Sequence, residues 1–149
     1  MIVLLAYFHY LALALGFTGV FLRGRELRKL LSNPSHGTKD LLLADNLWGV
    51  ATLLWVITGA LRVFGPYAKG QEYYFHNHWF YLKMALFGLV VLLEIYPMLT
   101  FIKWRILRKK ITAKDFPQIR VLKRINHVEA AITGILPFVA AVMARGRFI

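Results

Sequence analysis

Four apolar stretches, each close to the length that crosses a bilayer, constrain what this chain can fold into. A transmembrane helix needs about 20 mostly apolar residues to cross about 30 Å of hydrocarbon. The chain has 149 residues and a mean hydropathy of +0.54, so four such helices and their connections use almost all of it. The sequence therefore predicts a single all-α membrane domain over residues 1–149, an integral membrane four-helix bundle with up-down-up-down topology. The expected helices cover about 2–22, 44–65, 78–101 and 126–144.

The basic residues predict how this bundle is oriented. The net charge is +12, and the 19 Lys and Arg are unevenly spread. Five of them follow the first apolar stretch and nine follow the third, whereas only three lie in the opposite loop and the C-terminal tail. The positive-inside rule then places both basic connections in the cytoplasm and both termini outside. We expect a multi-pass protein of the bacterial inner membrane whose basic loops bind anionic lipid head groups, and no nucleic acid.

Ionisable residues inside the apolar stretches indicate where a functional site lies. Such a group costs at least about 2.5 kcal/mol at the centre of a membrane helix, so each one is a candidate site residue. His9, Arg62 and Lys83 fall in the predicted outer half of the bundle, whereas the carboxylates and His127 fall in the inner half. The ionisable residues in question are His9, Arg62, Lys83, Glu94, His127 and Glu129.

His9 is the first candidate ligand. At spacings of three and four it shares one helical stripe with Ala12, Gly16 and Gly19. Small residues let membrane helices approach closely, but they also leave room for a flat ligand beside the histidine. A histidine next to a glycine-lined cleft favours haem b, with the imidazole as an axial ligand of the iron. The alternative is a core histidine that bridges two helices by a hydrogen bond.

The other candidates follow from their predicted depth. His78 is the preferred second ligand, although a solvated histidine is common at such an interface. Arg62 and Lys83 either pair with an anionic group such as a porphyrin propionate or extend their charge to the interface. Glu94 and Glu129 either form ion pairs with basic residues of the inner side or relay protons. The proposed cofactor site comprises His9, Gly16, Gly19, Arg62, His78 and Lys83, with His9 and His78 as the metal ligands.

Short motifs along most of the chain resemble an uncharacterised family of four-helix bacterial membrane proteins. The pattern includes Asp45…Gly49…Gly59…Arg62, Lys69-Gly70, Lys83, Pro97, Trp104-Arg105 and Met143-Ala144-Arg145-Gly146.

A more distant resemblance is to the membrane protoporphyrinogen oxidases of the haem-b-binding type. Phe8-His9, Gly19 and Arg23 are similar to the first helix of those oxidases. Tyr81-Leu82-Lys83-Met84 is similar to their His-x-Lys-Leu motif, with Tyr81 in place of the histidine. Arg124-Ile125-Asn126…Glu129 is similar to their Arg…Asn-Glu motif, with His127 beside Asn126 where they have Glu. The resemblance implies that His9 ligates haem iron.

Three functions are compatible with these residues. The first is a haem-b-binding redox protein, which transfers electrons or oxidises a porphyrinogen-like or quinone-like substrate. The second is a small membrane protein without a cofactor that transports or binds an anionic solute or lipid. The third is copper handling, because copper-resistance membrane domains resemble such a bundle, but the chain has only four Met and no Cys. A bundle of this size has little interior volume, so a homo-oligomer is also expected.

Overall fold

The computed structural model describes residues 2–66 and 70–145, and in that part of the chain it contains helices and no strand. The four long helices are α1 (Ile2–Ser32), α2 (Lys39–Phe64), α4 (His78–Ile106) and α5 (Phe116–Arg145). Each is long and apolar enough to cross a membrane. The predicted all-α four-helix membrane fold is confirmed.

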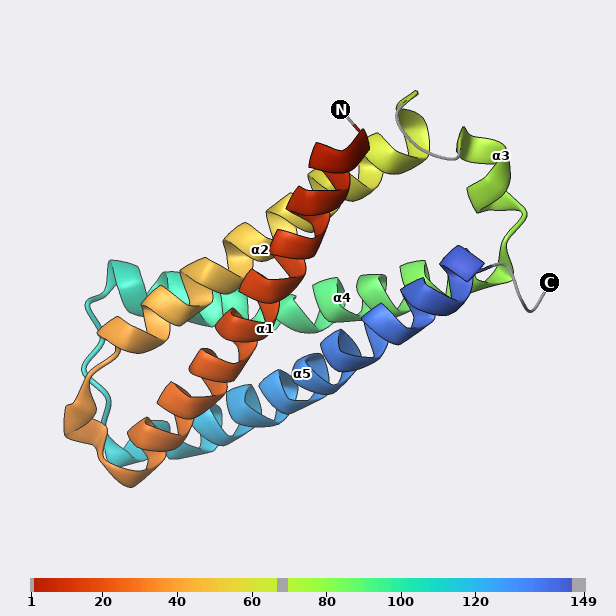
Figure 1. Ribbon diagram of the computed structural model, residues 1–149. Coiled ribbons are helices and arrows are strands. Elements are labelled where there is room, and N and C mark those ends of the chain that lie inside the picture. Colours follow the sequence, from red (N-terminus) through yellow and green to blue (C-terminus); the bar gives the residue numbers. More distant parts are fainter. Residues whose placement is uncertain (1, 67–69, 146–149) are drawn as a thin grey trace.

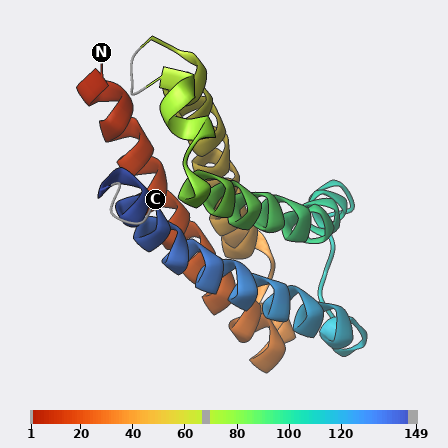
Figure 2. The ribbon, with the colours of Figure 1, turned by 90° about the vertical axis from the view of Figure 1, so that its right-hand side faces the viewer.

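The long helices run alternately in opposite directions (Figures 1 and 2). Figure 1 shows the α1–α2 and α4–α5 connections at one end of the bundle, which we call the basic end. Both helix ends nearest the termini lie at the other end with the short helix α3 (Gly70–Phe75), and we call this the termini end. Helix α3 lies in a segment for which the sequence predicted only a loop.

Each of the four helices extends past its predicted apolar stretch at the basic end. Helix α1 continues ten residues beyond the predicted 2–22, and α5 begins ten residues before the predicted 126–144. These extensions are amphipathic: Leu27 and Leu30 are buried, while Arg25 and Arg28 are exposed. Hydropathy marks only the apolar part of such a helix, whereas the backbone hydrogen bonds continue until a turn such as Asn33–Gly37 ends them.

Three apolar core clusters follow one another along the bundle. The cluster at the basic end includes Leu30, Phe101 and Trp104, and the central cluster includes Ala12, Trp48 and Trp55. A small cluster at the termini end consists of Tyr74, Phe80 and Met143. The outer surface also carries many large apolar side chains, among them Phe21, Leu92 and Phe138, as expected where helices face lipid.

Two features interrupt this apolar core. A cluster of charged side chains lies between the basic-end and central clusters, and a cavity lies between the central cluster and the termini end. The first is the buried cluster around Arg23, and the second contains His9.

Candidate functional site

A cavity of about 420 Å³ lies between all four long helices near the termini end. This volume falls within the range of about 300–1,000 Å³ that is usual for small-molecule sites. Most of the lining is apolar or aromatic, including Trp55, Phe80 and Phe87. Three of the residues that the sequence singled out, His9, Arg62 and Lys83, line this same cavity.

His9 is held in one orientation by helix α2. Its Nδ1 lies 2.8 Å from Oγ1 of Thr58, and that hydroxyl donates its own proton to the carbonyl of Leu54 at 2.5 Å. Thr58 must then accept from the ring, so Nδ1 carries the proton of the neutral imidazole. This leaves the lone pair on Nε2, the nitrogen that a metal would take. His9 thus bridges two helices, as the core alternative predicted, and its Nε2 forms no hydrogen bond with any of the described residues.

Arg62 and Lys83 give the cavity a positive charge. Arg62 lies in the last turn of α2 and Lys83 near the start of α4, and both side chains are only partly exposed. Both line the same cavity as His9, so the two cations lie near the imidazole and near each other. Neither forms an ion pair with any carboxylate of the described residues. The cavity is therefore suited to an apolar ligand that carries negative charge.

The two glycines of the candidate site serve helix packing. A Cβ atom built on Gly16 would lie 2.9 Å from the ring of Trp55, and one built on Gly19 would lie 2.8 Å from the backbone nitrogen of Trp48. Both glycines are buried, and neither is part of the cavity wall that the described residues form. The stripe below His9 is therefore filled by tryptophans of α2.

His78 does not share the cavity with His9. It is exposed at the first position of α4 and does not belong to the described residues that line the cavity. His76 and His127 are also exposed, and the Nδ1 of each donates to a backbone carbonyl four residues earlier in the chain. His9 is therefore the one histidine that the described part of the chain brings to the cavity.

Sequence reasoning missed the residue at the centre of the second polar feature, Arg23. The predicted first helix ended at position 22, which put Arg23 in a basic loop. Instead Arg23 belongs to α1, and its side chain is completely buried in the bundle. The signal was present, because Arg23 continues the stripe of His9, Gly16 and Gly19 at a spacing of four.

The Arg23 guanidinium binds carboxylates from three other helices. Its Nη1 donates to Glu94 of α4 at 2.8 and 2.9 Å and to Asp45 of α2 at 3.3 Å, and its Nη2 donates to Glu129 of α5. Its Nε donates to Asn126 at 2.8 Å. The expectation that Glu94 and Glu129 form ion pairs with basic residues is confirmed, and their shared partner is Arg23.

Trp48 links this cluster to the cavity. Its indole Nε1 donates to Glu94 at 3.0 Å, and its ring lies 5.4 Å from the Arg23 guanidinium carbon. The ring also contacts Trp55 edge-on at 6.2 Å, and Trp55 lines the cavity. The two polar features are thus joined through two tryptophans of α2.

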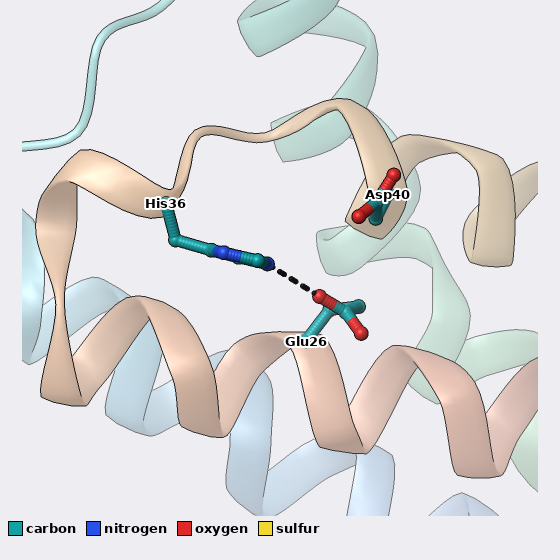
Figure 3. A group of neighbouring side chains, drawn as sticks. All are labelled: Glu26, His36 and Asp40. Atoms are coloured by element: carbon teal, nitrogen blue, oxygen red, sulfur yellow. Dashed lines mark hydrogen bonds and ion pairs between the residues drawn. The ribbon is translucent and has the colours of Figure 1, made fainter.

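A third group of polar residues lies at the basic end (Figure 3). Ligand atoms of Glu26, His36 and Asp40 lie within 4.8 Å of one another. The Glu26 carboxylate, however, already accepts from Lys29 at 2.9 Å, from Arg25 at 3.1 Å and from His36 at 2.8 Å. These partners compensate its charge, so we interpret the group as an ion-pair connection that holds the α1–α2 loop against α1.

The fold and these two interior features define a multi-pass membrane protein with a four-helix bundle and a polar interior. The profile of the family described as "Predicted membrane protein (DUF2214)" matches residues 2–147, and the chain belongs to this family. No curated protein and no solved structure matches the chain. The expected membership of a membrane protein family with no assigned function is thereby confirmed.

Proposed function

We propose that this protein binds haem b in the cavity near the termini end and has a redox role in the bacterial inner membrane. The observation that carries the proposal is His9, whose Nδ1–H is fixed by Thr58 and whose Nε2 is left for a ligand beside a cavity. A histidine whose second nitrogen is held by a hydrogen bond is the usual arrangement for a metal ligand. The distant resemblance to haem-b-binding oxidases supports the same residue.

The residues at the cavity fit such a group in charge and polarity. Apolar and aromatic walls suit the macrocycle, and Arg62 and Lys83 supply two cations for the propionates. His78 is exposed, so His9 is the ligand that the proposal retains. When bound, the haem would supply one-electron chemistry, for electron transfer or for oxidation of a porphyrinogen-like or quinone-like substrate.

Each residue of the cavity has its own role in this proposal. His9 would bind the haem iron through Nε2, and Thr58 orients the imidazole ring of His9. Arg62 and Lys83 bind the anionic edge of the ligand, and Trp55 and Phe87 exclude water from its apolar face.

A second function is favoured by the two cations alone. Arg62 and Lys83 are partly buried and lack carboxylate partners among the described residues, which is costly unless an anion binds there. An anionic amphiphile such as a lipid or another apolar acid would satisfy them without any cofactor. This is the transport or lipid-binding alternative.

An absorption spectrum of the detergent-purified protein tests the proposal. After expression with a haem supply, or after addition of hemin, we expect a haem spectrum that sharpens and shifts on reduction with dithionite. His9→Ala should lose these bands. His127→Ala, which removes an exposed histidine near the basic end, should keep them.

Absence of the bands from the wild-type protein under both conditions would reject haem. Lipids that co-purify with the wild type and are lost from the double variant Arg62→Gln, Lys83→Met would then support the anionic amphiphile.

A further inference from the structure

The cluster around Arg23 holds more carboxyl groups than its buried cation can neutralise. One guanidinium faces Asp45, Glu94 and Glu129. Among the described residues, the other charged group that reaches the cluster is Arg105, which lies 3.7 Å from Asp45 and is about half exposed. Three ionised carboxylates around one buried guanidinium would leave unpaired negative charge in an apolar interior, which is strongly unfavourable.

Glu129 is the least compensated of the three carboxyls. Glu94 accepts two hydrogen bonds from Arg23 and one from Trp48, and Asp45 contacts both Arg23 and Arg105. Glu129 is fully buried, and Arg23 bonds only its Oε2. Within the described part of the chain its Oε1 has no hydrogen-bond partner, and neither has the buried hydroxyl of Thr133 one helical turn further along α5.

We propose that this cluster is a proton-binding site and that Glu129 holds the proton. A proton from water at the basic end binds to a carboxylate oxygen of Glu129, and the water keeps the electron pair of the broken O–H bond. Release reverses this step. Protonation of Glu129 removes one of the three negative charges, and the charges of Asp45 and Glu94 are then balanced by Arg23 and by Arg105.

The exposed fractions of the three carboxyl side chains indicate the side from which the proton enters the cluster. The side chains of Asp45 and Glu94 are 16% and 17% exposed, whereas that of Glu129 is 0% exposed. Arg105 reaches Asp45 from the basic end of α4, so Asp45 lies on the route from that end. The proton therefore reaches Glu129 by way of Asp45 and Glu94.

The position of Arg23 favours a proton over a bound metal cation. The guanidinium lies within hydrogen-bonding distance of all three carboxyl groups, where it would repel a metal ion. A shared proton needs no shell of oxygen ligands. This proposal does not depend on haem in the cavity, because every residue that carries it lies in the Arg23 cluster.

Infrared difference spectroscopy of the protein in lipid or detergent tests the proposal. We expect a carbonyl stretching band of a protonated, buried carboxylic acid near neutral pH, with a shift in D₂O. Only seven Asp and Glu occur in the chain, so the band can be assigned by substitution. Glu129→Gln should remove the band, and Glu72→Gln, an exposed control outside the cluster, should leave it unchanged. Asp45→Asn should keep the band but slow its hydrogen–deuterium exchange.

Three results would overturn the assignment. One is a folded wild-type protein without the band over its whole range of pH stability. Another is a band that survives fully in Glu129→Gln. The third is a loss of the band when Na⁺ replaces choline at constant pH, which would indicate a metal-cation site. If Glu129→Gln does not fold, Glu129→Asp decides the point, because it keeps the carboxyl but should move the band.

Discussion

Arg23 joins four helices through a single side chain. It contacts Asp45, Glu94, Asn126 and Glu129 and is completely buried. Apolar contacts between membrane helices allow several rotations of each helix, whereas these directional bonds allow few. The cluster therefore fixes the rotation of the helices as well as holding charge.

Substitution of Arg23 tests how much this residue stabilises the folded protein. Arg23→Leu should destabilise the protein by about 3–5 kcal/mol, because three buried carboxyls lose their common cation. Thermal unfolding in detergent, followed by circular dichroism, measures the effect. Arg25→Leu is the matched control: this residue is exposed and, among the described residues, forms its ion pair with Glu26 alone, so its loss should cost about 0–1 kcal/mol. Equal effects of the two substitutions would contradict the central role of Arg23.

The cations of the cavity have a separate test. If Arg62 binds a propionate, Arg62→Gln should lower haem retention during purification while the spectrum of the remaining bound haem keeps its histidine ligation. Loss of one charge-assisted hydrogen bond is worth about 1.5–3 kcal/mol, or roughly 10- to 100-fold in affinity. Lys83→Met should act in the same direction but more weakly, since a lysine can extend its charge to the interface. Titration with hemin measures the affinity of each variant. If neither substitution changes that affinity, Arg62 and Lys83 do not belong to the haem site.

Among the elements, α1 and α2 form the closest pair. Gly19 lets the backbone of α1 approach that of α2 at Trp48, and Gly16 receives the ring of Trp55. This contact also places Thr58 beside His9 and Asp45 beside Arg23. The glycine stripe thus supports both polar features indirectly, through the packing of two helices.

Gly19→Ala should weaken this helix pair. The new methyl group would lie 2.8 Å from a backbone atom, which cannot move without shifting the helix. We expect a loss of about 1–3 kcal/mol, as for other overpacked cores. Gly49→Ala is the control on α2, because nothing lies within 4 Å of the added atom. Unfolding midpoints of the two variants in the same detergent check the difference, and an unaffected Gly19→Ala protein would refute the close contact.

For the whole molecule, the helix ends of α1 and α5 that are nearest the termini lie at the termini end, and the basic connections lie at the other end (Figure 1). Although Arg23 belongs to the interior, the basic end still carries Arg25, Arg28, Lys103, Arg105 and most of the other cations. The charge asymmetry that predicts the orientation is thus preserved in the folded chain.

Reporter fusions test this orientation. With the basic end in the cytoplasm, alkaline phosphatase fused after Ile149 should be active and a green fluorescent protein fused there should be dark. Fusions within the 107–115 connection should give the reverse pattern. An active cytoplasmic reporter after Ile149 would overturn the predicted topology.

The sequence by itself determined the number of long helices, their alternation and their apolar surfaces, since bilayer length and hydropathy act on each segment separately. It also selected His9, Arg62 and Lys83, because an ionisable residue in an apolar stretch is visible without a partner. Only the tertiary structure decided which of these meet. His78 is exposed although it is near His9 in predicted depth, and Gly16 and Gly19 pack against tryptophans. Arg23 became the centre of a buried cluster because the rotation of four helices, which hydropathy does not specify, turns three carboxyls toward it.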